Sequence, residues 1–467
     1  MSGFVTLGIK EFDEELGEIQ PGSLVIVHGG PGSGKTTFAL SFLKGGVESD
    51  EKTVFVSFVE GRNDIVRYSK AFNIDVEKLE ADGRIKIIEV PTLVKGLETV
   101  FNEIVNTVLN MGAKRLILDS FSAVRDVLGG DQDVRAFVHN ILLKLLKNQG
   151  ITTLITLERL GRIYEPTVEE YVADIVIDID QKFEEIYMRE LTIKKFRGKA
   201  LKRKRYCFTI HNGFKVIKPV PKPIREPVLH KVLEDGGDSC FSTGISDLDR
   251  IIGGGFEAGS VNLIMYSEEI PIAPLTLITP IIYQFVLNNR GVRIVSPPGY
   301  TAQQVKDTIS EALSMEKIDK YCRILDYSGG ETEHTKQIPH IELSKYFSKD
   351  AKTLHQVMLE LGEKTCKPIL AVDFIDVFEE LYGVKSTLQY LPGFIAYIRE
   401  TGNIALLLTV ASSRLHKDLI SLSDVYLHFF ERNGAVFIRG VKPATEAYAF
   451  QLYVENHVRK VSLIPMV

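Results

Sequence analysis

The stretch Val25–Phe42 reads VIVHGGPGSGKTTFALSF, and it decides the fold of the first part of the chain. It begins as an apolar strand and continues as a helix. Between the two, Gly29–Thr36 fits the pattern G-x-x-x-x-G-K-[ST]. Because this pattern stands after a strand and opens a helix, we predict a loop that cradles phosphates rather than an ordinary glycine-rich turn with an exposed lysine.

Each residue type in this loop has a task in phosphate binding. Glycines let successive backbone N–H groups converge on a phosphate, and the N-terminus of the helix adds partial positive charge. Lys35 can reach the β- and γ-phosphates, and the Thr36 hydroxyl can hold Mg²⁺. We therefore predict that ATP binds with Mg²⁺. The residues expected to surround it are Gly30, Pro31, Gly32, Ser33, Gly34, Lys35, Thr36 and Thr37.

Two carboxylates are candidates for the rest of this site. The run Arg115–Asp119 reads RLILD and ends a predicted strand, so Asp119 is the expected Mg²⁺ partner, acting through water. Without the phosphate loop, the same aspartate would be interpreted as a turn cap. Glu60 follows the strand VFVSFV and has two open interpretations, a base that polarises water or a surface glutamate.

A long phrase near the N-terminus recurs in the second half of the chain. TLGIKEFDEELGEIQPGSLVIVHG begins at Thr6, and TGISDLDRIIGGGFEAGSVNLIMY begins at Thr243. Downstream, RLILDS corresponds to ILAVDF, ITTLIT to IALLLT, and VADIVIDI to LSDVYLHF. The proline-rich run KPVPKPIREPV separates the copies. We predict two copies of one domain at 1–218 and 239–467, joined by a linker at 219–238.

Short apolar runs alternate with amphipathic stretches in the first copy, which is typical of an α/β fold with a mainly parallel, twisted sheet covered by helices on both faces. The later runs lack intervening helices and predict an antiparallel extension. The expected strands are 23–28, 54–58, 85–89, 115–119 and 151–157, the helices 35–46, 62–72, 94–110 and 131–148, and the extension 174–180, 187–196 and 205–217.

The bulk properties exclude several classes of protein. The 467 residues carry a net charge of −5, with 45% hydrophobic and 25% charged residues, so no global charge draws the chain to nucleic acid or an anionic membrane. The four irregularly spaced cysteines indicate reduced thiols. The chain shows no signal-peptide pattern and no uncharged run long enough to span a membrane. We expect a cytoplasmic protein.

These motifs together resemble the KaiC family of RecA-like ATPases. The marks are the phrase from Thr243 to Ser260 with its looser copy at Thr6, the phosphate loop, TLER at Thr156–Arg159 and KKFRG at Lys194–Gly198. The resemblance implies two tandem RecA-like P-loop domains and a homo-oligomer, with a hexameric ring favoured. It also implies that Lys195 and Arg197 act catalytically on the nucleotide of a neighbouring subunit, alongside Lys35 and Glu60.

The chain departs from the family pattern in two places. Val59 stands where the family has the first of two glutamates, so we expect slow hydrolysis. In the second copy, Tyr266–Ala273 aligns with the phosphate loop but contains no glycine or lysine, and it places Glu268 and Glu269 where phosphates would lie. Asp373 aligns with Asp119. We predict that 239–467 is an inactive ATPase domain kept for structure, assembly or protein partners.

The segment KKFRGKALKRKRY, Lys194–Tyr206, carries eight basic residues and no acid. It has two interpretations, a patch that contacts nucleic acid and a solvated edge hairpin. We favour the hairpin, because runs of charge usually face solvent and because acidic residues follow the TLER motif, where recombinases bind DNA.

The leading hypothesis is a slow, regulatory or signalling KaiC-like ATPase. The alternative is a RadA-like recombinase paralogue acting on DNA in repair, and a third possibility is ATP that is bound but not hydrolysed.

Overall fold

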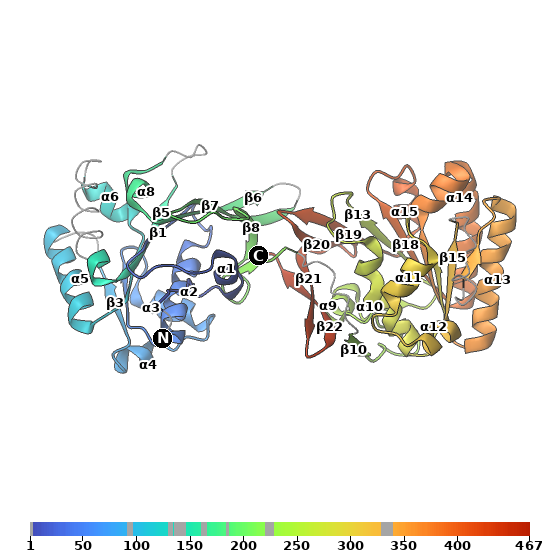
Figure 1. The fold of residues 1–467 in the computed structure, drawn as a ribbon, viewed down its shortest axis with the longest axis horizontal. Coiled ribbons are helices and arrows are strands. Elements are labelled where there is room, and N and C mark those ends of the chain that lie inside the picture. Colours follow the sequence, from blue (N-terminus) through green and yellow to red (C-terminus); the bar gives the residue numbers. More distant parts are fainter. Residues whose placement is uncertain are drawn as a thin grey trace. The chain divides into compact units, whose positions relative to one another are not determined.

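The structure is a computed structural model that describes residues 3–90, 97–128, 134, 146–159, 166–183, 186–219, 228–327 and 340–467. The chain divides into two compact units, each with its own core (Figure 1). The first comprises residues 1–218 together with Met466 and Val467, and the second comprises residues 219–465. Among the described residues, no helix has the length and apolar character needed to cross a membrane.

The first unit is built on one sheet, with strand order β3-β2-β4-β5-β1-β6-β7-β8-β9 among the described residues. The strands from β3 to β6 pair in parallel, and β6 to β9 pair antiparallel. The strands are β1 (Leu24–Gly29), β2 (Thr53–Ser57), β3 (Ile85–Glu89), β4 (Arg115–Asp119), β5 (Thr152–Glu158), β6 (Ile175–Phe183), β7 (Tyr187–Phe196), β8 (Arg205–Thr209) and β9 (Lys215–Ile217).

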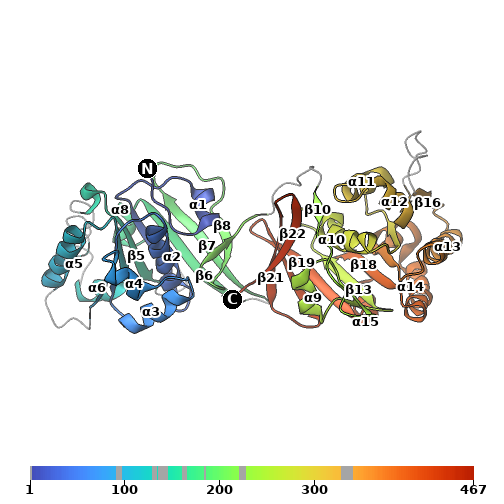
Figure 2. The ribbon, with the colours of Figure 1, turned by 90° about the horizontal axis from the view of Figure 1, so that it is seen from below.

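Helices cover both faces of this sheet, because the parallel crossovers need them (Figures 1 and 2). Phe38 and Phe42 of α2 pack on one face, and Phe101 and Ile104 of α5 pack on the other. The helical elements of this unit are α1 (Lys10–Leu16), α2 (Lys35–Glu48), α3 (Arg62–Lys70), α4 (Val76–Ala81), α5 (Leu97–Met111), α6 (Ser122–Leu128), α8 (Val168–Val172) and the 3₁₀ helix η2 (Lys147–Gln149).

The predicted fold class is confirmed, and every expected strand of the first copy is present, with 23–28, 54–58, 85–89, 115–119 and 151–157 within one residue and 174–180 extended to Phe183. The run expected at 205–217 is two strands, because a turn with Gly213 at φ 107° separates β8 from β9. The helix expected at 131–148 lies almost entirely outside the described residues.

The second unit repeats this topology. Its larger sheet has the order β10-β22-β21-β20-β19-β13-β18-β17-β14-β15-β16 among the described residues, so the run from β15 to β21 matches that from β3 to β8. Its strands are β10 (Leu229–His230), β11 (Cys240–Phe241), β12 (Phe256–Glu257), β13 (Val261–Tyr266), β14 (Val292–Val295), β15 (Cys322–Asp326), β16 (His340–Glu342), β17 (Leu370–Phe374), β18 (Ile404–Val410), β19 (Val425–Arg432), β20 (Ala435–Lys442), β21 (Ala447–Glu455) and β22 (Val458–Pro465).

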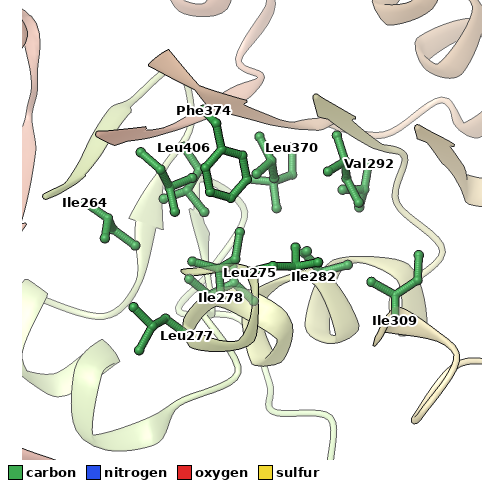
Figure 3. Packing of buried hydrophobic residues seen from close by; sticks show 14 of the residues in the cluster. Ile264, Leu275, Leu277, Ile278, Ile282, Val292, Ile309, Leu370, Phe374 and Leu406 are labelled. Atoms are coloured by element: carbon green, nitrogen blue, oxygen red, sulfur yellow. The ribbon is translucent and has the colours of Figure 1, made fainter. Parts of the chain in front are cut away.

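Two helical layers again enclose the sheet. The face covered by α10 is almost wholly apolar, and it includes Leu275 and Ile278 packed against strand residues (Figure 3). The helices of this unit are α9 (Ser246–Ile252), α10 (Pro274–Leu287), α11 (Ala302–Ile309), α12 (Met315–Tyr321), α13 (Phe347–Thr365), α14 (Ile375–Thr401) and α15 (His416–Leu422). Gly383, at φ 76°, breaks the regular course of α14.

The predicted linker at 219–238 is described only in part, because residues 220–227 lie outside the described residues. Its later residues take part in the second unit, where Leu229–His230 pairs in parallel with β22. At the other end of the chain, Val467 belongs to the first unit. Its backbone bonds to Thr209 and Ile210, at the end of β8.

Candidate functional site

A cavity of about 340 Å³ opens in the first unit where β1 and β4 end, at the carboxyl edge of the parallel strands. This edge is where open α/β sheets bind ligands. The loop between β1 and α2 forms one wall. The lining residues are Pro31, Gly32, Ser33, Gly34, Lys35, Thr36, Thr37, Val59, Glu60, Asp119, Ser120, Glu158 and Ile210.

Glycine is required at several positions of this loop. Gly32 and Gly34 have φ values of 70° and 104°, a region that side chains disfavour. A Cβ on Gly29 would lie 2.2 Å from Ser33 Oγ and 2.8 Å from Ile179 O, so only glycine fits between the loop and β6. The loop therefore forms a cradle, and a methyl group added at Gly29 would collide with its walls.

Lys35 lies at the start of α2 and is buried. Its Nζ donates to Gly29 O at 3.0 Å and to Gly30 O at 2.9 Å. Burial lowers the pKa of Lys35, and the nearby carboxylates of Glu158 and Asp119 oppose this shift. The ammonium group therefore lies in a position where an anion in the cavity would stabilise its charge.

Asp119 and Thr36 lie together, as the metal prediction requires. Thr36 Oγ1 donates to Asp119 Oδ2 at 2.8 Å, and Thr156 Oγ1 donates to Oδ1 of the same carboxylate. Burial raises the pKa of Asp119, while the bonds from Thr156 and Thr36 and the charge of Lys35 lower it. A hydroxyl and a carboxylate beside a phosphate cradle are oxygen ligands of the kind Mg²⁺ takes, so these residues fit the ion.

Two glutamates line the same cavity. Glu60 is half-buried and follows the 71% exposed Val59, and its backbone carbonyl accepts from Ser57 Oγ at 2.6 Å. Glu158, the last residue of β5, is exposed and close enough to Lys35 to affect its pKa. Glu60 is the base predicted from the sequence, and Glu158 is a second carboxylate that lines the same cavity.

Two side chains that no sequence pattern indicated hold the loop from outside. Arg189 of β7 donates through Nη1 to Gly32 O at 3.0 Å and Ser33 O at 3.1 Å. Its Nε donates to Val467 O at 2.7 Å, and Gln181 of β6 also donates to Gly32 O. A charged residue in an amphipathic strand normally indicates an exposed position, whereas Arg189 is 8% exposed.

Lys195 and Arg197 do not line the cavity around Lys35. Lys195 Nζ donates to Glu170 O at 2.8 Å and Tyr171 O at 3.0 Å. Arg197 pairs with Asp174 at 3.5 Å and lines a different cavity of the first unit. Within one chain, these two predicted residues therefore lie apart from the phosphate loop.

The two units can be matched residue by residue through equivalent hydrogen bonds. Leu24 N bonds to the Asp174 carboxylate at 3.0 Å, and Val261 N bonds to the Asp424 carboxylate at 2.9 Å, so Leu24 corresponds to Val261. Leu24 pairs with Thr153 of β5, which pairs with Leu116 of β4. Val261 pairs with Ala405 of β18, which pairs with Ala371 of β17, so Leu116 corresponds to Ala371. Counting along both strands, Asp119 therefore corresponds to Phe374.

The sequence alignment of Asp373 with Asp119 is therefore wrong by one residue. Because side chains alternate along a strand, Asp373 points to the opposite face from Asp119. There it forms a wholly buried ion pair with Arg293. The aromatic ring of Phe374 points toward α10 instead and packs among Leu370 and Leu406 (Figure 3).

A tyrosine lies at the end of β13, at the same edge of the second sheet. Tyr266 corresponds to Gly29, is 8% exposed, and donates its hydroxyl to Asp376 Oδ2 at 2.8 Å. Thr409 Oγ1 donates to Oδ1 of the same carboxylate at 2.9 Å. Where the first unit has a glycine and an open cavity, the second has an aromatic ring bonded to a carboxylate.

The basic segment Lys194–Tyr206 connects β7 to β8, which pair antiparallel. Lys194 pairs with Asp178 at 3.7 Å, and Lys199 donates to Leu16 O. Lys202, Lys204 and Arg205 are exposed. Part of this positive charge is therefore engaged within the first unit, and the rest faces solvent.

Comparison with known proteins agrees with this geometry. Residues 5–222 match the family model of the KaiC ATPase, and residues 235–467 match the model described as GvpD basic region 2. The circadian clock protein KaiC2 of Synechocystis sp. is 34% identical over 272 residues, which cover 55% of this chain and 46% of KaiC2. The protein GvpD2 of Halobacterium salinarum is 23% identical over 495 residues, covering 98% of this chain and 97% of GvpD2.

The circadian clock oscillator protein KaiC of Acaryochloris marina is 30% identical over 270 residues, which cover 55% of this chain and 50% of that protein. The match thus spans about half the length of each of the two clock proteins. The phosphate cradle, the Thr36–Asp119 pair and the family match agree on an ATP-binding first unit. The first unit of the chain is therefore a KaiC-like ATPase domain of the RecA superfamily.

Proposed function

We propose that this protein is a slow, regulatory ATPase that binds one ATP per chain, in the first unit. The observation that carries the proposal is the contrast between equivalent edges of the two sheets. One has a glycine cradle with Lys35, Thr36 and Asp119, and the other has Tyr266 at the position of Gly29 and Phe374 at the position of Asp119. A triphosphate needs donors and counter-charge, which the first edge offers.

In this proposal each residue of the first unit has a defined role. The loop backbone and Lys35 bind the phosphates, and the Thr36 hydroxyl and the Asp119 carboxylate hold Mg²⁺, which neutralises phosphate charge when bound. Glu60, with Glu158 next to it, positions the attacking water and accepts its proton. Because Val59 takes the place of a further carboxylate, proton transfer is inefficient and turnover is slow.

We also propose that the active form is a ring, with six subunits favoured. Lys195 and Arg197 lie apart from the phosphate loop of their own chain, so a role at the γ-phosphate requires a neighbouring subunit. A cation supplied in trans would stabilise the charge that develops on the transferred phosphoryl group. Hydrolysis would then depend on assembly.

The second unit, in this proposal, binds no ATP and serves assembly or protein partners. Aromatic rings at the positions of Gly29 and Asp119 stabilise the unit through apolar burial and offer neither the glycine nor the carboxylate that the first unit has there. The chain resembles GvpD2 over nearly its whole length and the clock proteins over only about half of theirs, so the proposal includes no role in clock timing.

Counting bound nucleotide tests this proposal. Equilibrium binding of ATP with Mg²⁺ to the full chain should give one site per chain, and Lys35→Ala should abolish it. Single-turnover hydrolysis by wild type and Glu60→Gln should show a slow rate that the variant lowers. Two sites per chain, or nucleotide that remains bound to Lys35→Ala, would contradict the proposal, and equal negligible rates would leave ATP as a bound but unhydrolysed ligand.

A further inference from the structure

The second unit contains a cavity of about 350 Å³ between α13 and α14, on the face of the sheet opposite α10. Its size is at the lower end for small-molecule sites. Five of the ten residues that line it have aromatic rings, and His355 and Gln389 are exposed among the ten. They are Arg293, Phe347, Ala351, His355, Met358, Gln389, Tyr390, Gly393, Phe394 and Tyr397.

Arg293 is the unusual residue of this cavity, because it is charged and 0% exposed. It pairs with Asp373, and its Nη1 donates to Leu354 O at 3.3 Å. Its Nε has no hydrogen-bond partner, and neither has Asp373 Oδ1. A buried ion pair whose hydrogen bonds are incomplete costs free energy, so its presence calls for an explanation.

The first unit shows that the fold does not need this pair. By the strand registers, Arg293 corresponds to Val54 and Asp373 to Leu118, and both of those residues belong to an apolar core. An ion pair has thus replaced two aliphatic side chains beside a cavity open to solvent. The guanidinium also lies over the Phe394 ring, 5.3 Å from its centroid, and Phe394 stacks on Tyr390 at 5.4 Å.

We propose that this cavity is a binding site for a small planar nitrogen heterocycle, of the class of free nucleobases and nucleosides. Aromatic walls stack on a planar ring of any kind. Arg293 lines the cavity, and a shift of its buried guanidinium would offer the unpartnered Nε–H to a ring nitrogen or carbonyl oxygen. Because Asp373 neutralises the guanidinium, the site selects an uncharged ring rather than a phosphate.

A fluorescent nucleoside without phosphates, 2-aminopurine riboside, tests the proposal with the full chain. The chain has no tryptophan, so emission from the probe can be followed without interference. We expect saturable binding, with displacement by adenosine or uridine. Gly393 has nothing within 4 Å of a Cβ placed on it, so Gly393→Phe can fill the cavity without a clash at the backbone, and we expect it to abolish binding. Gly393→Ala is the matched control and should bind as wild type does.

A second variant removes the donor and keeps the fold. The double substitution Arg293→Val with Asp373→Leu restores the residues of the first unit, and it should weaken probe binding about tenfold or more. Absence of saturable binding to wild type up to about 1 mM probe would overturn the proposal. Equal binding by Gly393→Phe would also overturn it, as would loss of binding in Lys35→Ala, because that loss would place the probe in the first unit.

Discussion

Phe374 stands in the second unit at the strand position that Asp119 holds in the first. The strand registers fix this correspondence, and the two side chains point toward equivalent helices, α10 and α2. A carboxylate that accepts from Thr36 in one unit is thus replaced by an aromatic ring in an apolar core. The second unit therefore has buried apolar surface at the point where the first unit has a carboxylate.

Phe374→Asp should destabilise the second unit without creating a nucleotide site. An unpaired carboxylate in this core loses the packing of the ring and is not solvated, so we expect a loss of about 3 kcal/mol or more in unfolding free energy. Phe374→Leu is the control, with an expected loss of about 1 kcal/mol. Urea unfolding and the ATP stoichiometry measure both effects, and a second bound ATP in the aspartate variant would refute the expectation.

Asp119→Asn should separate nucleotide binding from metal binding. The amide is nearly isosteric and its oxygen can still accept from one of the two threonines, but it carries no charge for Mg²⁺. We expect ATP affinity to fall at least about tenfold in Mg²⁺ and to stay near the wild-type value in EDTA. Thr156→Val serves as a control for lost hydrogen bonding alone. If affinity fell equally in both buffers, Asp119 would act on the loop rather than on the metal.

Arg189 is expected to position the phosphate loop. Arg189→Gln removes charged donors from the Gly32 and Ser33 carbonyls, and we expect about tenfold weaker ATP binding. Arg205 lies on the adjacent strand and is exposed, so Arg205→Gln is a matched control that should bind ATP normally. Titration calorimetry distinguishes the two variants. Unchanged affinity in Arg189→Gln would mean that the loop keeps its shape without this residue.

Mixing two inactive variants tests the trans role of Arg197. Lys35→Ala lacks nucleotide but keeps Arg197, whereas Arg197→Ala keeps its nucleotide site and lacks the cation. If Arg197 acts on a neighbouring subunit, mixed assemblies of the two should hydrolyse ATP faster than either variant alone. A rate equal to the sum of the rates of the separate variants would mean that Arg197 takes no part in the reaction or acts within its own chain.

Adding duplex DNA to the wild-type protein should leave the rate of ATP hydrolysis unchanged. Stimulation of hydrolysis by DNA would favour the recombinase alternative.

The sequence predicted the fold and the phosphate loop well, because both depend on local patterns. A glycine loop between a strand and a helix is visible in Val25–Phe42, and the repeated phrase shows that the topology occurs twice. The registers of strands are not local, however. Asp373 matched Asp119 letter by letter, yet a one-residue offset turns its side chain to the opposite face. Arg189 was missed for a related reason, since its contacts form only when β7 lies beside the loop.

The offset of Asp373 also bears on the history of the chain. Regaining a metal ligand at Phe374 would require a charge in a core that is already closed, and Tyr266 would have to become glycine as well. Each of these changes alone weakens the second unit and offers nothing to selection. A single substitution at Phe374 or at Tyr266 would therefore reproduce only part of the arrangement that the first unit has at the same edge of its sheet.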